Sequence, residues 1–130
     1  MTSPIAVVVL AAGAGTRMKS AIPKVLHPLA GWPMLRHVLE NVGRLKPSRV
    51  VGVIAPGDKA VAQAFAPHPS VVQKRPVGTG DAAKAALGAL KGHRGPVLVV
   101  FGDAPLVTTA SMQCLVAACR KEEAAVGVLG

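Results

Sequence analysis

Aromatic residues are scarce in this chain of 130 residues, which has one tryptophan, two phenylalanines and no tyrosine. Proteins that bind single strands of nucleic acid stack the bases on aromatic side chains, and Trp32, Phe65 and Phe101 are too few for that. Cysteine is scarce as well. Cys114 and Cys119 do not form a CxxC motif and exclude a disulfide scaffold. We interpret both as buried thiols.

Charged residues are also few, at 16% of the chain against a usual share of about 25%. Because 51% of the residues are hydrophobic, intrinsic disorder is excluded. A coiled coil is excluded as well, because it would need far more glutamate and lysine. The longest apolar run, residues 5–12, is far short of the roughly 20 residues that cross a bilayer. No basic residue precedes this run, which argues against a secretory signal. We expect a cytoplasmic protein with no membrane partner.

Acidic residues are the rarest charged type, since 6 of them face 15 lysines and arginines and the net charge is +9. Such a balance favours anionic partners. The cations are scattered, and their longest run is Lys74-Arg75. We therefore expect the phosphates of a small molecule rather than nucleic acid. A non-catalytic basic module that binds nucleic acid stays as an alternative, and salt-sensitive binding would identify it.

Hydrophobic patterning alternates between strands and helices. Continuous apolar runs predict strands at 5–10, 50–54, 71–73, 96–101 and 125–129. Helical periodicity predicts helices at 34–45, with Pro33 in the first turn, at 58–65, with Asp58 as N-cap, at 81–90 and at 109–123. This alternation predicts an α/β fold, a Rossmann-like open and mainly parallel sheet with helices on both faces. No helix follows the last strand, so we expect the sheet to be incomplete at its C-terminal side.

The segment between the first strand and Pro33 is a loop of about twenty residues, where two to six are usual. Open α/β sheets bind ligands at the carboxyl ends of their strands, so we expect the function there. Gly13 with Lys19-Ser20 partly matches a phosphate loop, and Gly13 with Gly15 partly matches a dinucleotide fingerprint, but in both patterns Met18 stands where a glycine is required.

A third pattern fits this loop and continues along the chain. Its motifs are Leu10, Ala12-Gly13, Gly15-Thr16-Arg17-Met18 and Pro23-Lys24-Val25-Leu26, followed by His27–Leu39, Gln73 with Gly78–Ala82, and Phe101–Leu106. On the first motif the chain resembles the sugar-nucleotide pyrophosphorylases. On all of them it resembles the uridyltransferase half of the bacterial bifunctional N-acetylglucosamine-1-phosphate uridyltransferase/glucosamine-1-phosphate acetyltransferases.

This resemblance implies a fold of the nucleotide-diphospho-sugar transferase type, with residues 1–130 as the nucleotide-binding, N-terminal portion of a nucleotidyltransferase domain. It implies a Mg²⁺-dependent enzyme that converts UTP and N-acetylglucosamine 1-phosphate to UDP-N-acetylglucosamine and pyrophosphate, for peptidoglycan and lipopolysaccharide precursors. Another MobA-like enzyme, transferring a guanylyl or cytidylyl group to molybdopterin, stays as an alternative. The segment from Gln73 to Ala82 argues against it.

The resemblance also implies roles for individual residues. Arg17 and Lys24 would be catalytic cations that grip the triphosphate. The nucleotide-binding residues would be Leu10, Ala11, Ala12 and Gly13 through their backbone, together with Lys24, Gln73, Gly78 and Thr79, the last three at the uracil edge. Asp103 would be the metal ligand. Its position after a buried strand agrees, because Mg²⁺ prefers carboxylate and phosphate oxygens.

Members of this family are considerably longer than 130 residues. Their sugar-recognition segments, an asparagine that is the second Mg²⁺ ligand, and a left-handed β-helix that transfers the acetyl group lie beyond the matched part. We therefore expect this chain to bind UTP, to need a C-terminal half or a partner chain for the full reaction with the sugar 1-phosphate, and to lack acetyltransferase activity.

Overall fold

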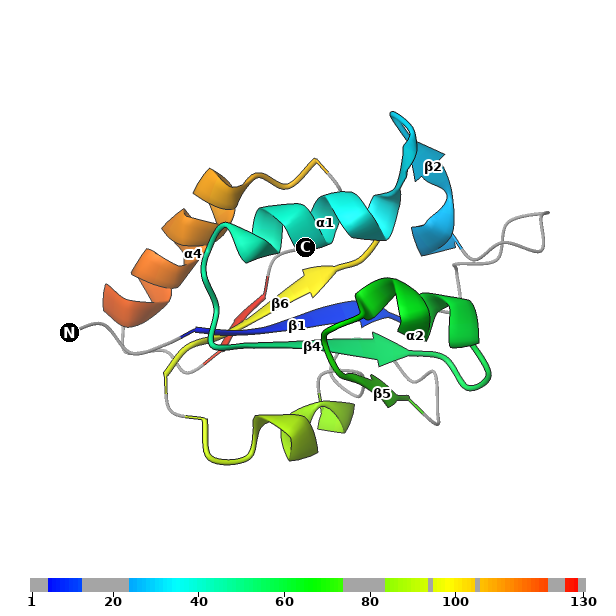
Figure 1. The fold of residues 1–130 in the computed structure, drawn as a ribbon. Helices are drawn as coiled ribbons and strands as arrows, with labels where there is room; N and C mark the ends of the chain where they lie inside the picture. The colour runs from blue at the N-terminus through cyan, green and yellow to red at the C-terminus, as the bar shows by residue number, and fades with distance from the viewer. Residues whose placement is uncertain are drawn as a thin grey trace.

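The structure is a computed structural model, and it describes residues 5–12, 24–73, 84–93, 95–104, 106–121 and 126–128. The strands of its main sheet are β1 (Ala6–Ala11), β4 (Arg49–Ile54), β5 (Ser70–Val72), β6 (Val97–Phe101) and β7 (Val126–Val128). They lie in the order β5-β4-β1-β6-β7, and every neighbouring pair is parallel (Figure 1). This arrangement confirms the predicted Rossmann-like open sheet.

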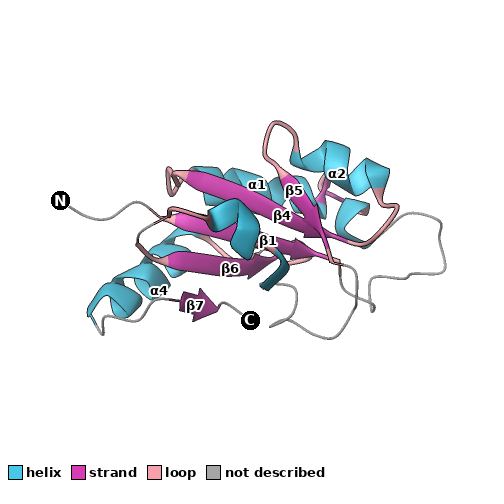
Figure 2. Cartoon of the chain, turned by 90° about the horizontal axis from the view of Figure 1, so that it is seen from below, coloured by secondary structure: helices cyan, strands magenta, loops and turns pink. Residues whose placement is uncertain are grey.

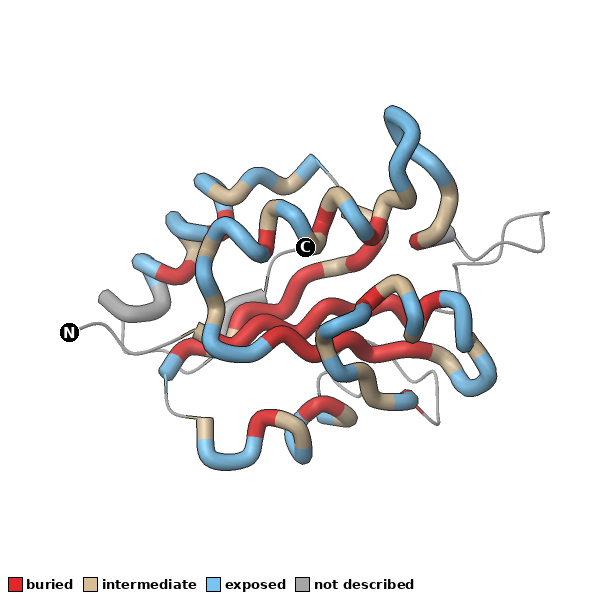
Figure 3. The backbone as a smooth tube through the Cα atoms, in the orientation of Figure 1, coloured by how far each residue is buried: buried red, intermediate tan, exposed pale blue. Residues whose placement is uncertain are grey.

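The helices cover the two faces of the sheet unequally. One face is covered by α1 (Met34–Gly43), α2 (Lys59–Phe65) and α4 (Thr109–Lys121), whose buried residues form one core with those of β1. The short segment 84–90, which ends in the 3-10 helix Leu87–Leu90, packs on the other face (Figure 2). Strand β1 is therefore buried on both sides (Figure 3), as its continuous apolar run predicts.

The unit β6–α4–β7 is built with the opposite hand to β1–α1–β4. The two units run in opposite directions across the sheet, yet α1 and α4 lie on the same face (Figure 1). Parallel crossovers are right-handed in almost all proteins. Because the two units have opposite hands, one of them is an exception to this rule. Buried apolar contacts hold α4 on this face of the sheet, since Met112 and Val116 of α4 belong to the same hydrophobic core as Leu35 and Val38 of α1.

A β-hairpin that was not predicted follows the first part of the long loop. The 3-10 helix Lys24–Leu26 leads into β2 (Pro28–Leu29), which pairs antiparallel with β3 (Trp32–Pro33). The turn residues Ala30 and Gly31 have φ of 52° and 86°, as a tight hairpin turn requires. Alanine seldom adopts this conformation and proline seldom lies in strands, so the sequence gives little sign of the hairpin.

Helix boundaries differ in detail from the predictions. The first helix begins at Met34, one residue after Pro33, whose ψ of 144° places it before the helix. Asp58 does precede α2, but its side chain makes no capping hydrogen bond. The reason is local: its ψ is 68°, outside the extended region of a capping residue, and the amide of Lys59 donates to Gly57 at 2.9 Å. The predicted helix at 81–90 is described only from residue 84 onward.

The interpretation of Cys114 as a buried thiol is wrong, because this residue lies on the exposed side of α4. The burial of Cys119 lies outside what the structure describes. Within the described part of the chain, no helix has both the length and the apolar character needed to cross a membrane.

Candidate active site

The order of the strands reverses between β1 and β6. From β1 the chain adds β4 and then β5 on one side, and it returns across the sheet to form β6 and β7 on the other. In open α/β sheets such a switch point is where ligands bind, at the carboxyl ends of the two strands. Here the amide of Gly102 donates to the carbonyl oxygen of Leu10 at 2.9 Å, so these two ends are joined directly.

The end of β1 offers its backbone rather than its side chains. Leu10, Ala11 and Ala12 are at most 8% exposed, and their side chains belong to the two cores. Their side chains are therefore not available to a ligand, and the predicted contacts of these residues through main-chain atoms stay a prediction. Gly13 lies outside the described residues.

The turn that carries Lys24 packs against the end of β6. Val25, the next residue, is 1% exposed, and its Cγ1 would lie 3.2 Å from a Cβ atom placed on Gly102. The carbonyl oxygen of Leu10 would lie 3.3 Å from the same Cβ. The turn Lys24–Leu26 and the end of β1 therefore both lie next to Gly102, the residue immediately before Asp103. The side chain of Lys24 and all of Arg17 lie outside the described part.

Asp103 follows β6 and is half-buried, in a turn closed by the amide of Ala104, which donates to the carbonyl oxygen of Phe101 at 3.2 Å. Its place at the carboxyl edge agrees with the prediction. Among the described residues, no group of three or more histidine, cysteine or acidic side chains is placed to hold a metal. A metal at Asp103 would need oxygen ligands from elsewhere, such as substrate phosphates.

Gln73 lies at the same edge of the sheet but further from the switch point. It directly follows β5, its amide donates to the carbonyl oxygen of Ile54 at 2.9 Å, and the residue is only 5% exposed. Because β4 separates β5 from β1, the backbone ends of β5 and β1 are about 10 Å apart. A nucleotide is long enough to cover this span. Gly78 and Thr79 lie outside the described residues.

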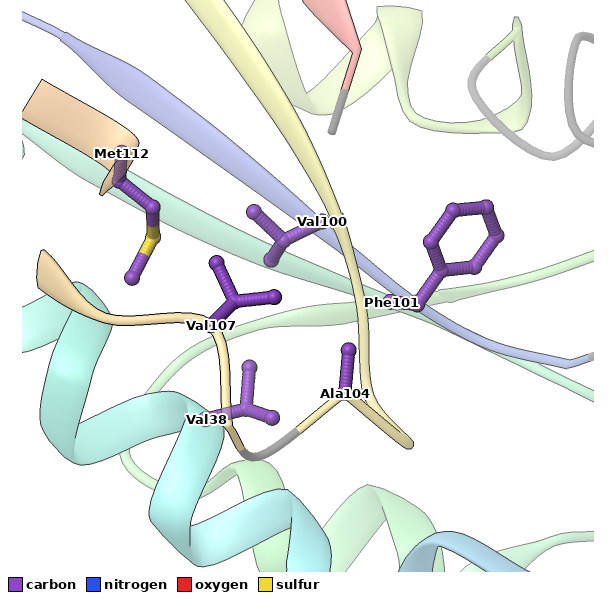
Figure 4. A pocket seen from close by; sticks show the side chains of 6 residues that line it. All are labelled: Val38, Val100, Phe101, Ala104, Val107 and Met112. Atoms are coloured by element: carbon purple, nitrogen blue, oxygen red, sulfur yellow. The ribbon is translucent and has the colours of Figure 1, made fainter. Parts of the chain in front are cut away.

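A small apolar hollow lies under the turn that carries Asp103. It is lined by Val38, Val100, Phe101, Ala104, Val107 and Met112 (Figure 4). The side chains of Val38, Val100, Val107 and Met112 point toward one another, whereas the ring of Phe101 points away from them. A lining without charged groups does not suit phosphates. The hollow is a packing feature between β6, α1 and α4.

Gly102 is a site residue that the sequence analysis did not single out. It is buried where the turn of Lys24, the end of β1 and α1 converge, and a Cβ atom there would also lie 3.4 Å from Cδ1 of Leu35. Its position in the sequence, immediately before Asp103 and after a continuous apolar run, is the one sign that could have indicated it.

We expect Gly102→Ala to lower the free energy of unfolding by about 1 kcal/mol, because two neighbours, the side chain of Val25 and the carbonyl group of Leu10, must each move by a few tenths of an ångström. Urea unfolding measures this. Shortening the nearest neighbour in the double variant Gly102→Ala/Val25→Ala should relieve the crowding, so that the alanine at 102 costs less there than in the wild type. Equal costs in both backgrounds would contradict the packing argument.

Comparison with known proteins agrees with this geometry. Residues 7–130 match the model of the MobA-like NTP transferase domain. The chain is 48% identical over 130 residues to the bifunctional protein GlmU of Paramagnetospirillum magneticum, covering 99% of this chain and 29% of that protein. It is 51% identical over 126 residues to GlmU of Rhodospirillum rubrum, covering 96% and 28%. The chain thus spans less than a third of these relatives.

Solved structures share the fold. The 4-diphosphocytidyl-2C-methyl-D-erythritol synthase of Anaerococcus prevotii superposes with a TM-score of 0.73 at 19% identity, over 92% of this chain and 52% of that one. A manganese complex of Rv0371c from Mycobacterium tuberculosis superposes with a TM-score of 0.69 at 21% identity, over 91% and 60%. Together with the family match over most of the chain, the switch-point geometry leads to one conclusion: the chain belongs to the MobA-like NTP transferase family and is a nucleotidyltransferase domain.

Proposed function

We propose that this domain binds UTP at the switch point and serves uridylyl transfer to N-acetylglucosamine 1-phosphate. The observation that carries the proposal is the convergence of the end of β1, the turn of Lys24 and Asp103 around the buried Gly102. The identity of about half of the residues to two GlmU proteins supports it further. The products would be UDP-N-acetylglucosamine, a precursor for cell-envelope synthesis, and pyrophosphate, the by-product.

A divalent cation fits this site through substrate oxygens. Asp103 is a half-buried carboxylate at the carboxyl edge, and one carboxylate together with phosphates and water is a usual Mg²⁺ environment. A structural neighbour at low identity is a manganese complex, so the site is proposed for Mg²⁺ with Mn²⁺ as a probe. When bound, the cation would neutralise charge on the phosphates. Asp103 would be its ligand from this chain.

In the proposed reaction, a phosphate oxygen of the sugar 1-phosphate attacks the α-phosphorus of UTP. A new P–O bond forms, and the bond from the α-phosphorus to the bridging oxygen breaks, so pyrophosphate leaves with the electron pair. Such displacements depend on positioning and on neutralising negative charge. Arg17 and Lys24 would hold the triphosphate and stabilise the developing charge. The chain's own contribution is therefore to orient the nucleotide and to supply cations.

Recognition of the base is proposed for the far side of the same edge. The amide group of a glutamine both donates and accepts hydrogen bonds, which matches the imide and carbonyl of uracil. Gln73 is positioned by the bond from its backbone amide to Ile54 and is buried. With β4 between the two positions, the base would lie by Gln73, with Gly78 and Thr79 beside it, and the triphosphate by Lys24.

Calorimetric titration of the 130-residue chain tests the proposal, with UTP and Mg²⁺ and with CTP, GTP and ATP as controls. We expect UTP to bind at least about tenfold more tightly than the others, the factor that one well-placed hydrogen bond of about 1.4 kcal/mol provides. Preference for CTP or GTP would assign the chain to another nucleotidyltransferase. Equal or absent binding of all four would overturn the proposal, and salt-sensitive binding of nucleic acid without UTP binding would favour a basic module instead.

A further inference from the structure

Two hydrogen bonds connect α1 to the segment that follows Asp103. The side-chain amide of Asn41 donates from Nδ2 to the carbonyl oxygen of Val107 at 3.0 Å. The hydroxyl of Thr109, the first residue of α4, donates to the carbonyl oxygen of Asn41 at 2.9 Å. Both bonds are partly buried. The two residues are far apart in sequence, so these contacts exist only in the folded chain.

The way α1 ends makes its last turn available for these bonds. In a continuing helix the amide of Leu45 would donate to Asn41, but it donates to the carbonyl oxygen of Val42 at 3.0 Å instead. The carbonyl oxygens in the last turn of a helix need partners from outside the helix. Thr109 is such a partner for Asn41. The connection thus uses groups that the end of the helix leaves free for tertiary contacts.

These bonds fix the far end of the segment 102–108. Its near end is held by the amide of Gly102 on the carbonyl oxygen of Leu10. Between the two ends, Ala104 and Val107 line the apolar hollow together with Val38 and Met112 (Figure 4), and apolar contacts are non-directional. The bond from Gly102 to Leu10 and the bonds of Asn41 with Val107 and Thr109 therefore give the segment a directional restraint at each end.

The same helix also holds the segment that carries Lys24. At the start of α1, the amide of Met34 donates to the carbonyl oxygen of His27 at 3.0 Å, three residues after Lys24. Also in the first turn of the helix, Leu35 packs next to the position of Gly102. One rigid helix is thus connected at its start to the turn of Lys24 and at its end to the segment of Asp103.

We infer that Asn41 and Thr109 are positioning residues, which hold Asp103 at a fixed distance from the turn of Lys24 so that the two act on one cation–triphosphate complex. Neither residue touches the substrate in this inference; both act through the segment 102–108. The inference rests on the proposed function, because it assigns to that segment the task of holding a divalent cation. Loss of either bond widens the range of positions that Asp103 occupies.

The test compares four variants of the 130-residue chain. Asn41→Leu removes the donor to Val107, and Thr109→Val removes the donor to Asn41, each with nearly unchanged shape. Thr109→Ser keeps the hydroxyl. Val42→Ala is the matched control, because this neighbour of Asn41 is a buried core residue and its truncation lowers stability without removing either bond.

The measured quantity is the gain in UTP affinity on adding Mg²⁺, given by the ratio of Kd in EDTA to Kd with Mg²⁺. We expect this ratio to fall about fivefold in Asn41→Leu and in Thr109→Val, the size of one lost hydrogen bond. It should stay within about twofold of the wild type in Thr109→Ser and Val42→Ala, although Val42→Ala lowers Tm. An unchanged ratio in Asn41→Leu, or an equal fall in Val42→Ala, would overturn the inference.

Amide hydrogen exchange distinguishes failure of this inference from failure of the proposed function. If the wild-type chain binds no UTP, the proposed function fails, but the positioning of the segment is still measurable. We expect the amides of Ala104 and Val107, which close turns on Phe101 and Ala104, to exchange about fivefold faster in Asn41→Leu than in Val42→Ala. Equal exchange rates in these two variants would show that Asn41 does not hold the segment.

Discussion

Replacing Asp103 with asparagine is expected to remove most of the metal-dependent gain in UTP affinity. Asparagine keeps the size and one oxygen of the side chain but loses the negative charge that a hard divalent cation requires. Interactions with charged groups contribute roughly 1.5–3 kcal/mol, so the affinity in the presence of Mg²⁺ should fall about tenfold to a hundredfold. Titrations with and without EDTA measure this, and the affinity in EDTA should change little.

Glu40→Gln is the matched control for this experiment. It removes one negative charge from the exposed surface of α1 and leaves the carboxyl edge intact. We expect its metal-dependent gain to equal that of the wild type. If both variants lose affinity to the same extent, the effect of Asp103 is one of net charge, and its assignment as a metal ligand is wrong. Retention of the full gain in Asp103→Asn would contradict the assignment directly.

Replacing Gly52 with alanine is expected to have the largest effect on stability. Gly52 lies in β4, where a Cβ atom would come within 2.5 Å of the ring of Phe65 on α2. The ring is fully buried, so it cannot move aside without displacing the core around it. Overpacking of this kind typically costs 1–3 kcal/mol, and we expect about 2 kcal/mol by urea unfolding.

Two further variants separate overpacking from the general effect of a glycine substitution. Gly43→Ala, at the exposed end of α1 with no atom within 4 Å of the added Cβ, should be neutral or slightly stabilising. In a Phe65→Leu background, where the ring is absent, Gly52→Ala should cost less than half as much as in the wild type. A cost that is the same in both backgrounds would show that the ring is not the cause.

The strands were predictable because their burial determines the pattern of apolar residues within each strand. In β1, β4 and β6 both faces are covered, so apolar residues follow one another without the alternation of a half-exposed strand. Helix α1 was predictable for a related reason: Leu35, Val38 and Val42 recur at helical spacing and form its buried side. In these elements local pattern and tertiary environment agree.

The hairpin Pro28–Pro33 and the side chain of Asp58 were not predictable in the same way. The hairpin depends on a backbone conformation at Ala30 that alanine disfavours, so contacts outside the turn must support it, among them the bond from the amide of Met34 to the carbonyl oxygen of His27. At Asp58 the residue type favours a cap, but the turn through Gly57 sets a backbone angle that prevents it. Local preference was overridden in both places.

The candidate site also has a part that was predictable from local sequence and a part that was not. The sequence by itself determined where the candidate residues lie, since Leu10–Ala12 stand at the end of one apolar run that predicts a strand, Asp103 follows another, and parallel strands bring their carboxyl ends to one edge. Only the tertiary structure decided how these pieces are joined: Gly102 as the point where β1, β6 and the turn of Lys24 meet, and Asn41 with Thr109 as the link from α1 to the Asp103 segment. The physical reason is the separation along the chain of the residues that interact. A strand or a helix produces a periodic pattern of apolar residues within its own segment, whereas a hydrogen bond between residues 41 and 109 changes no such pattern in either segment.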